Sequence, residues 1–387
     1  MKNIVVLGCT GSIGDSVFKV LQALPGEFRV LGASGGAQVE KLAERARHWG
    51  AEFICVAAND QVERLQAILP ETTIWAGAEG LVELATLPQA DIVLNGLVGA
   101  VGLEPTLRAL EAGKVVGMAN KEPLVMAGDL LLQRAACGGG EILPLDSEPN
   151  ALWQCLKGEA AQDVERLILT ASGGPFFGQT RVQMEAITPQ QALDHPTWTM
   201  GPKITVDSAT LMNKGFEVIE ASCLFGVGIE QIDVVIHRQS IVHSMVEFTD
   251  GSIVAHLGKT DMALPIQYAL THPRRQPSPL GRLDLVKAGT LTFDAPDTDH
   301  FPCLPLCYQV GRQGGCAPAV LNAANEVAVA AFLQGKIGFL DIAAINEKAL
   351  EVFDEVELDS LQAVLEVDRA ARRRAVEQVA LRAGINV

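Results

Sequence analysis

The sequence predicts an α/β protein, with a parallel sheet in its N-terminal part, a mixed α+β region in the middle and helices in its C-terminal part. Short apolar runs alternate with helical segments as far as about residue 145, which is typical of a parallel sheet. Three more apolar runs and a hairpin signal follow in the middle of the chain. Beyond residue 298, apolar side chains recur at helical spacing.

Composition limits the class of protein. A chain of 387 residues can form two or three domains, and 48% hydrophobic with 20% charged residues is typical of a globular protein. The 30 basic and 46 acidic residues give a net charge of −16, which argues against nucleic-acid or anionic-membrane binding. We expect a cytoplasmic protein with neither signal peptide nor membrane span, and its eight cysteines, which form no C-x-x-C pair, to be reduced thiols.

The first apolar run is followed by a regular glycine pattern. Ile4–Leu7 leads into Gly8, Gly11 and Gly14, and residues 15–24 then have a helical pattern. Glycines between a strand and a helix let backbone amides approach a pyrophosphate, which the helix N-terminus also attracts. This favours a Rossmann-type dinucleotide site over a purely structural turn.

The residues after the second apolar run indicate the type of cofactor, because they include no acidic residue. Phe28–Ala33 is followed by Ser34, two glycines, Ala37 and Gln38. A site for NAD usually has an Asp or Glu at this strand end, so its absence favours NADPH. The first basic residue beyond the strand is Lys41, which leaves Ser34 and backbone amides as the nearer donors.

Further strand and helix units complete the predicted parallel sheet. The predicted strands are Phe53–Ala57, Ile92–Gly96, Val115–Ala119 and Ile142–Leu145, and the predicted helices are Gln61–Leu69 and Glu104–Ala112. Ligands bind beyond the carboxyl ends of such strands. Polar residues follow two of these ends, namely Asn120, Lys121, Glu122, Asp146 and Glu148.

Asp146 and Glu148 are a candidate metal-binding pair. If the strand that begins at Ile142 continues, its side chains alternate, and the two carboxylates point the same way. Paired carboxylates suit Mg²⁺ or Mn²⁺. The alternative is two solvated acids in a loop.

Candidate phosphate ligands follow in the middle region. The run Leu167–Thr170 opens into Ser172 and two glycines, which can bind a phosphate or form an ordinary turn. The segment Asp194–Pro202 contains His195, Trp198 and Met200, and its prolines predict a loop. This loop either packs inward or covers a ligand, and His195 alone can equally be structural.

A helix with several polar residues is predicted at Thr210–Ala221. Asn213 and Glu217 share one of its faces, with Lys214 beside it, and Ser208 near its N-terminus suits an anion. Glu220 is a rival third carboxylate, and spacing does not decide between it and Glu217.

The rest of the chain predicts a second sheet and a helical end. The predicted strands are Ile232–Ile236, Ile241–Phe248 and Ser252–Leu257, with a hairpin turn at Asp250-Gly251. An exposed sheet edge here is a natural dimer seam. The region His272–Pro296 is rich in Pro, Gly and Arg and indicates a linker. The predicted C-terminal helices run from Pro318 to Ala331, from Leu340 to Leu350 and from Leu361 to Leu381.

In their order, these motifs resemble those of the 1-deoxy-D-xylulose 5-phosphate reductoisomerases over essentially the whole chain. The matching segments are residues 8–14, 120–122, 146–148, 172–176, 195–201, 207–217, 237–244, 261–262 and 322–326. The resemblance implies an NADPH-dependent enzyme of non-mevalonate isoprenoid biosynthesis. Such an enzyme rearranges 1-deoxy-D-xylulose 5-phosphate by retro-aldol cleavage and re-addition, and then reduces the aldehyde to 2-C-methyl-D-erythritol 4-phosphate.

The resemblance also implies roles for individual residues. Asp146, Glu148 and Glu217 would hold Mg²⁺ or Mn²⁺ (Co²⁺ is a further option), which favours Glu217 over Glu220, and Lys121 would lie near the reacting carbons. The implied substrate-binding residues are Ser147, Glu148, Ser172, His195, Trp198, Ser208, Asn213, Lys214, Glu217 and Met262, with Met200 in the closing flap. The implied cofactor-binding residues are Thr10, Gly11, Ser12, Ile13, Ser34, Gly36, Ala37, Gln38, Asn120, Lys121, Glu122 and Gly201.

The implied organisation is a homodimer whose ligands are small molecules, without nucleic-acid or membrane partners. We expect an NADPH-binding domain at 1–146, a catalytic, metal-binding and dimerisation domain at 147–271, a linker at 272–297 and a helical domain at 298–387. Three positions depart from the family pattern. Ala37 and Gln38 stand where Lys or Arg followed by Asn is usual, and Arg238 stands where proline is common.

Two other functions compete with this one. The first is a metal-assisted NAD(P) hydroxyacid dehydrogenase without carbon migration. The second is a nucleotide-binding regulatory protein without catalysis, against which the dense polar set of the middle region argues.

Overall fold

In a computed structural model, which describes residues 1–351, 353 and 356–384, the chain forms two compact units. The first unit comprises Met1–Pro123, Leu131–Asn150 and Asp261–Arg282. The second comprises Leu124–Leu130, Ala151–Thr260 and Leu283–Val387. The four-part domain division expected from the sequence stays a prediction.

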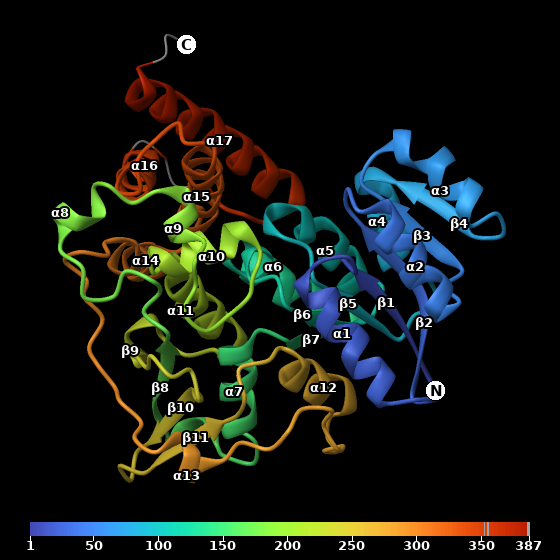
Figure 1. The fold of residues 1–387 in the computed structure, drawn as a ribbon, viewed down its shortest axis with the longest axis horizontal. Helices are drawn as coiled ribbons and strands as arrows, with labels where there is room; N and C mark the ends of the chain where they lie inside the picture. The colour runs from blue at the N-terminus through green and yellow to red at the C-terminus, as the bar shows by residue number, and fades with distance from the viewer. Residues whose placement is uncertain (352, 354–355, 385–387) are drawn as a thin grey trace. The chain divides into compact units, whose positions relative to one another are not determined.

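The first unit is built on a seven-stranded sheet in the order β4-β3-β2-β1-β5-β6-β7 (Figure 1). Its strands are β1 Lys2–Leu7, β2 Phe28–Gly35, β3 Phe53–Val56, β4 Thr73–Ala76, β5 Ile92–Asn95, β6 Val115–Met118 and β7 Glu141–Pro144. All pairings between them are parallel, which confirms the predicted parallel sheet.

Helices follow the strands of this sheet. They are α1 Ser12–Ala23, α2 Val39–Trp49, α3 Val62–Ile68, α4 Gly77–Ala85, α5 Leu103–Glu111, α6 Glu122–Gly138, α7 Ser147–Cys155 and α12 Ala263–Thr271, with short 3₁₀ helices at Asn59–Gln61 and Gly99–Gly102. Helices α4 and α5 pack on each other, and α12 packs against α1 and β7. Right-handed crossovers place α1 to α3 on one face of the sheet and α4 and α5 on the other.

The sequence of the central strand, β1, is an unbroken run of apolar residues because the strand is buried on both faces. Ile4, Val5, Val6 and Leu7 are each no more than 1% exposed. A strand with helices on both faces buries every side chain, so no polar residue alternates with the apolar ones.

The glycine loop after β1 packs too closely for side chains. A Cβ atom at Gly8, where φ is +79°, would lie 2.6 Å from the carbonyl oxygen of Gly96. At Gly14, a Cβ would lie 2.0 Å from the carbonyl oxygen of Cys9. The glycines therefore bring the start of α1 directly against the end of β1.

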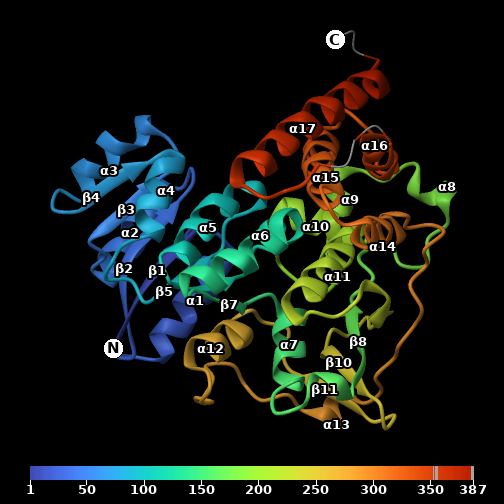
Figure 2. The ribbon, with the colours of Figure 1, turned by 180° about the vertical axis from the view of Figure 1, so that it is seen from behind.

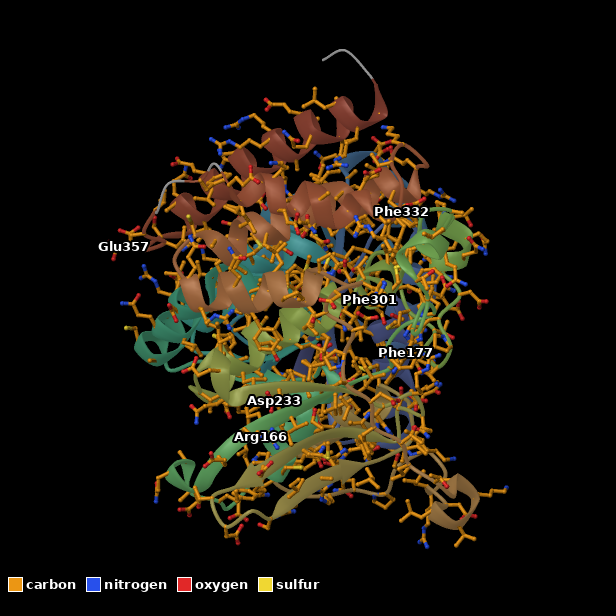
Figure 3. All side chains as sticks on the ribbon, turned by 90° about the vertical axis from the view of Figure 1, so that its left-hand side faces the viewer. Arg166, Phe177, Asp233, Phe301, Phe332 and Glu357 are labelled. Carbon is orange, nitrogen blue, oxygen red and sulfur yellow. The ribbon has the colours of Figure 1, made fainter. Side chains whose placement is uncertain are left out.

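The second unit contains a four-stranded mixed sheet in the order β11-β10-β8-β9. The strands are β8 Val164–Ala171, β9 Ile232–Ile236, β10 Val242–Phe248 and β11 Ile253–Leu257. Strands β8 and β9 are parallel, and the other pairings are antiparallel, as a mixed sheet requires. Arg166 on β8 forms ion pairs with Asp233 on β9 and Glu247 on β10, which links three strands across one face (Figure 3).

Helices make up the rest of the second unit. They are α8 Arg181–Met184, α9 Pro189–Ala192, α10 Pro202–Ala209, α11 Met212–Phe225, α13 Leu285–Ala288, α14 Cys303–Gln313, α15 Ala317–Leu333, α16 Asp341–Leu350 and α17 Leu361–Ala383, with 3₁₀ helices at Ala161–Asp163 and Ile229–Gln231. Helix α15 is the centre of the C-terminal part, because α10, α14, α16 and α17 all pack on it (Figure 2).

Two local predictions were wrong. The strand before Asp146 ends at Pro144, and α7 begins at Ser147, so Glu148 lies in the first turn of a helix and strand alternation does not orient it. The predicted helix from Thr210 begins two residues later, at Met212 of α11, because Leu211 has a left-handed φ of 61° and separates α11 from α10. Ser208 therefore lies in the last turn of α10 and not at a helix N-terminus.

Elements within the predicted linker are short. Between residues 272 and 297 the structure forms α13, and Asp294 makes an isolated bridge with Ile236 of β9. Helices α12 and α14 were not predicted. Among the described residues, no helix is both long enough and apolar enough to cross a membrane.

The glycine packing yields a stability prediction. We expect Gly14→Ala to lower the free energy of unfolding by about 3 kcal/mol or more, because its Cβ would collide with backbone that no side-chain rotation can relieve. Gly36→Ala is the matched control, since a Cβ there would meet no atom within 4 Å. Urea unfolding followed by circular dichroism measures both, and equal midpoints would contradict this account of the loop.

Candidate functional site

The carboxyl ends of five neighbouring strands meet at one edge of the first unit's sheet. Strands β2, β1, β5, β6 and β7 are adjacent and parallel, so the residues that follow them share that edge. Those residues include the glycine loop, residues 36–38, Asn120 to Glu122 and Asp146. This is the edge at which doubly wound sheets bind dinucleotides.

Two basic side chains of α2 hold the glycine loop. The Lys41 ammonium donates to the carbonyl oxygen of Thr10 at 2.9 Å, and Arg45 donates to that of Gly14 at 2.9 Å. Both form ion pairs with Asp15, at 2.8 and 2.5 Å. The first basic residues after β2 thus already hold the loop from which α1 starts.

The end of β2 divides into a buried and an exposed part. Ser34 is 2% exposed, and its hydroxyl oxygen accepts the amide of Gly8 at 3.0 Å. Gly36, Ala37 and Gln38 are exposed between β2 and α2. The exposed residues are therefore the ones that a cofactor group beyond this strand would meet first.

Buried amide side chains shape the ends of β5 and β6. The Asn120 amide donates to the carbonyl oxygens of Leu97 and Gly99, at 2.7 and 3.1 Å. The Asn95 amide donates to Thr106 and to the carbonyl oxygen of Gly102, at 2.8 and 3.2 Å. These bonds fix the loop after β5 beside the glycine loop.

Asp146 and its neighbours form a compact acidic group in the first unit. The Lys121 ammonium lies 2.5 Å from a carboxylate oxygen of Asp146, and both side chains are buried. The other carboxylate oxygen of Asp146 accepts the amide of Ser147 at 2.9 Å. The Ser147 hydroxyl donates to Glu148 at 2.7 Å. Lys121 therefore offsets the charge of Asp146, as buried charges require.

Glu217 has a similar environment in the second unit. It is 0% exposed on α11. Asn213, four residues earlier, donates its amide to one carboxylate oxygen at 2.6 Å, and Lys214 forms an ion pair with the other. The four-residue spacing thus places Asn213 and Glu217 on one helix face, as expected.

The donor set fits a divalent metal ion. Asp146, Glu148 and Glu217 form the candidate metal-ligand group among the described residues, and Glu220, although buried on the same helix, is not part of it. When ionised, the three carry three negative charges against two positive charges of their lysine partners, and their hard oxygens suit Mg²⁺ or Mn²⁺.

His195 connects two serines in the second unit. Its Nε2 atom lies 3.0 Å from the hydroxyl of Ser172 and 3.0 Å from that of Ser208. Its Nδ1 atom accepts the backbone amides of Thr197 and Trp198, at 3.2 and 3.0 Å. Because Nδ1 is an acceptor, the proton lies on Nε2 and the ring is neutral.

The environment of His195 favours this neutral form. Burial, and secondly the positive charge of Arg238, lower the pKa of His195 from its ordinary 6.5 to about 4. A neutral Nε2–H and two hydroxyl groups are therefore gathered from three segments. Such a group can bind the oxygens of an anion.

The segment around Trp198 is a loop, as predicted, up to the point where Pro202 starts α10. The Trp198 ring lies 6.5 Å from that of His243 on β10, and the Thr197 hydroxyl lies 3.4 Å from that of Ser240. Gly201 caps α10. Met262, which was predicted in the same pocket, precedes α12 in the first unit.

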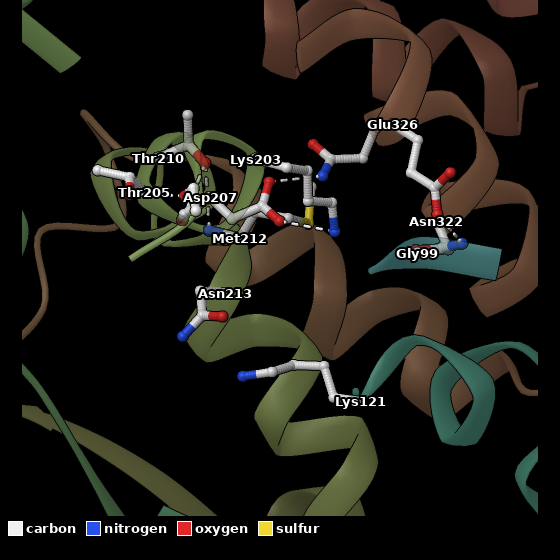
Figure 4. A network of polar contacts seen from close by, with 12 residues as sticks. Gly99, Lys121, Lys203, Thr205, Asp207, Thr210, Met212, Asn213, Asn322 and Glu326 are labelled. Atoms are coloured by element: carbon white, nitrogen blue, oxygen red, sulfur yellow. Dashed lines mark hydrogen bonds and ion pairs between the residues drawn. The ribbon is translucent and has the colours of Figure 1, made fainter. Parts of the chain in front are cut away.

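A buried polar network beneath Ser208 was missed by sequence reasoning (Figure 4). Asp207 is 1% exposed, forms an ion pair with Lys203 at 2.8 Å and accepts the amide of Asn325 at 2.7 Å. Asn346 donates to Asn325 at 3.1 Å. The polar pair Asn322 and Asn325 in an otherwise apolar helix was the available signal, since buried amides need partners. The network anchors α10 to α15 and α16.

Three protein-family models match successive parts of the chain. The model described as 1-deoxy-D-xylulose 5-phosphate reductoisomerase matches residues 4–128. The model for the C-terminal domain of that enzyme matches residues 142–225. A further model, described as the DXP reductoisomerase C-terminal domain, matches residues 257–374.

Whole proteins of the same description are similar over their full length. The 1-deoxy-D-xylulose 5-phosphate reductoisomerase of Bacillus cereus (strain Q1) is 49% identical over 98% of this chain and 100% of its own. That of Exiguobacterium sibiricum is 50% identical over 96% and 97%.

Two solved structures have the same fold. A DOX-P reductoisomerase in complex with NADPH, fosmidomycin and magnesium has a TM-score of 0.93 and 40% identity, over 98% of this chain and 99% of its own. The enzyme from Zymomonas mobilis in complex with NADPH has a TM-score of 0.91 and 41% identity, over the same shares of the two chains.

The neutral state of His195 gives a testable pH dependence. The unfolded chain binds a proton at this histidine below about pH 6.5, whereas the folded chain does so only near pH 4. Its contribution therefore lowers the free energy of unfolding as the pH falls from 6.5 towards 4. We expect His195→Gln to flatten the loss of stability across this window, measured by urea unfolding at several pH values. Parallel curves for the variant and the wild type would contradict the lowered pKa.

Proposed function

The chain belongs to the 1-deoxy-D-xylulose 5-phosphate reductoisomerase family, and we propose how its own residues carry out that family's reaction. The enzyme is an oxidoreductase that uses NADPH and a divalent metal to convert 1-deoxy-D-xylulose 5-phosphate into 2-C-methyl-D-erythritol 4-phosphate. This places it in isoprenoid biosynthesis. The assignment of roles to individual residues below is our proposal.

We assign the metal to Asp146, Glu148 and Glu217. Support comes from their membership of one candidate ligand group and from the lysine beside each of the two buried carboxylates. When bound, a divalent cation polarises a substrate carbonyl and neighbouring hydroxyl that chelate it.

We assign the substrate phosphate to Ser172, His195 and Ser208, with Asn213 and Lys214 on the next helix. The shared hydrogen bonds of His195 with both serines support this assignment. The loop with Trp198 and Met200 follows His195 directly, so phosphate binding would order the loop that excludes water. The binding energy of the phosphate, which does not react, would thereby help to orient the reacting carbons.

We assign the cofactor to the edge of the first unit's sheet. NADPH supplies the hydride, and its pyrophosphate would lie at the glycine loop and the start of α1. Residues 36–38 would meet the adenosine end of the cofactor, and Asn120 to Glu122 the other. Ser147, which holds both Asp146 and Glu148, and Lys121 would lie nearest to the reacting carbons.

The proposed rearrangement is a retro-aldol cleavage followed by re-addition. As the carbon–carbon bond breaks, a substrate hydroxyl loses its proton and becomes an aldehyde carbonyl, and the electrons of the bond leave an enolate oxygen on the other fragment. Lys121 can donate a hydrogen bond to that developing charge. Re-addition of the enolate to the aldehyde forms the new carbon–carbon bond, and the resulting alkoxide takes the proton back. The branched aldehyde would then be reduced to an alcohol by the hydride of NADPH together with one proton. Lys121 is buried, and its ion pair with Asp146 orients its ammonium group.

We also propose a homodimer and a cytoplasmic location. Strand β11 lies at an edge of its sheet and exposes Ile253, Val254 and Leu257 by 51, 41 and 37%, which supports pairing of this edge with a second copy. A monomeric mass in sedimentation equilibrium would contradict the dimer. The cytoplasm suits the eight cysteine thiols.

The observation that carries the proposed chemistry is the candidate ligand group of Asp146, Glu148 and Glu217. We expect NADPH oxidation with deoxyxylulose phosphate and Mn²⁺ or Mg²⁺, and its loss with EDTA. The product should be the branched polyol phosphate. An unrearranged alcohol would favour a simple hydroxyacid dehydrogenase, and no oxidation at all would favour a regulatory nucleotide-binding protein.

A matched pair of variants tests the third ligand. We expect Glu217→Gln to lower turnover by roughly a thousandfold or more and to weaken Mn²⁺ binding measured by calorimetry, because one anionic ligand is lost. Glu220→Gln removes a buried carboxylate three residues along the same helix and should retain turnover. Equal losses in the two variants, or near-normal turnover of Glu217→Gln, would reject Glu217 as a ligand.

Because Ala37 is exposed, a substitution at this position can increase the affinity for NADPH. We expect Ala37→Arg to tighten NADPH binding by about tenfold, since a guanidinium can bind the 2′-phosphate, while NADH binding stays the same. The change costs little stability because the residue is exposed. Dissociation constants from tryptophan fluorescence titration measure this, and equal tightening for both nucleotides would show that position 37 does not recognise the 2′-phosphate.

A further inference from the structure

Among the five side chains assigned to the substrate phosphate, only that of Lys214 carries a positive charge. The hydroxyls of Ser172 and Ser208 are neutral, and His195 is neutral because its Nδ1 accepts two backbone amides. Lys214 on α11 is engaged by the carboxylate of Glu217. A phosphate monoester carries nearly two negative charges at neutral pH, so its subsite needs a cation whose charge is not offset by an acid.

Arg238 lies beside this subsite and is bonded to its backbone. It follows β9, and one guanidinium nitrogen, Nη1, donates to the carbonyl oxygens of Ser172 and Gly174, at 2.9 and 2.6 Å. The guanidinium also lies 5.3 Å from the ring centre of Phe177, in the same loop. Both bonds end on neutral carbonyl groups, so they fix the side chain without neutralising it.

The loop that Arg238 holds has an unusual backbone. Gly173 and Gly174 both adopt left-handed φ values, 77° and 66°. A Cβ at Gly174 would lie 2.9 Å from the carbonyl oxygen of Ser208. The loop therefore packs closely against the end of α10, and Arg238 holds it through the carbonyl oxygens of Ser172 and Gly174. The position of the Ser172 hydroxyl depends on this clamp.

The positive charge of Arg238 affects the pKa of His195 within the subsite. Burial is the first cause of the low pKa of His195, and the charge of Arg238 is the second. The guanidinium thus disfavours the protonated form of an imidazole whose Nε2 contacts both serine hydroxyls. The same guanidinium would attract an anion that is bound by these hydroxyls.

We propose that Arg238 is a positioning and specificity-determining residue for the substrate phosphate: it holds the Ser172 loop in place and supplies a positive charge in addition to that of Lys214, which Glu217 offsets. The inference rests on the proposed function, because it requires a phosphorylated substrate at Ser172, His195 and Ser208. It predicts discrimination between phosphorylated and unphosphorylated forms of the same sugar.

The experiment compares wild type, Arg238→Gln and Arg238→Lys with two substrates, deoxyxylulose phosphate and unphosphorylated deoxyxylulose. For the phosphorylated sugar, Arg238→Gln should raise KM by about tenfold to a hundredfold with little change in kcat, since the lost interaction acts equally on bound substrate and transition state. Arg238→Lys should restore most of the affinity because it keeps the charge. For the unphosphorylated sugar, kcat/KM should be similar in all three proteins.

A purely structural clamp gives a different result. Loss of loop order alone would lower kcat/KM for both sugars by the same factor and would not be rescued by lysine, and either finding would overturn the proposal. An unchanged KM in Arg238→Gln would do so as well. A wild-type protein that fails to oxidise NADPH with deoxyxylulose phosphate would instead reject the proposed function.

A second measurement keeps the test decisive if Arg238→Gln does not fold. Nitrogen-15 spectra of the wild-type arginine side chains, with the Arg238 signal assigned from Arg238→Lys, are recorded during titration with inorganic phosphate. We expect the Arg238 signal to shift and saturate together with the imidazole signals of His195. A saturating shift of His195 without one of Arg238 would contradict the inference.

Discussion

The site depends on lysine side chains that offset buried carboxylates. Asp146 has Lys121 beside it in the first unit, and Glu217 has Lys214 in the second. A carboxylate as buried as Glu217 would otherwise be too costly to keep ionised. The two lysines offset the charge of the three acids of the proposed metal site only in part. A divalent ion at the proposed site would therefore have both oxygen ligands and an electrostatic driving force to bind.

The scaffold explains why these groups occur where they do. Parallel strands end at one edge, so the glycine loop that follows β1 and Asp146, which follows β7, lie at the same edge as Asn95 and Asn120 although they are distant in sequence. Close packing at Gly8 and Gly14 makes that edge rigid. In the second unit, the network from Lys203 through Asp207 to Asn325 ties α10 to the C-terminal helices. The helical region therefore supports the phosphate ligand Ser208, although it contributes no ligand of its own to the proposed site.

Much of this could be predicted from the sequence, and the failures have physical causes. The buried strands were predictable because a strand that is covered on both faces contains apolar residues throughout. The glycine loop was predictable because a left-handed backbone conformation favours glycine. The helix that starts at Ser147 was missed because strand alternation was carried past the end of the strand at Pro144 as far as Glu148. Ser208 was placed at the wrong end of a helix because Leu211 adopts a left-handed backbone conformation, which a leucine side chain does not predict. Arg238 was noticed as a departure, but its role depends on contacts with segments some sixty residues away, which no local pattern encodes.

The most direct test of the central claim is the location of bound Mn²⁺ by anomalous scattering in crystals of the full chain grown with Mn²⁺ and NADPH. The account predicts one peak, with an oxygen from each of Asp146, Glu148 and Glu217 at about 2.1 Å. A peak that is bound by Glu220, or by Asp146 and Glu148 with Glu217 still held by Lys214 alone, would contradict it.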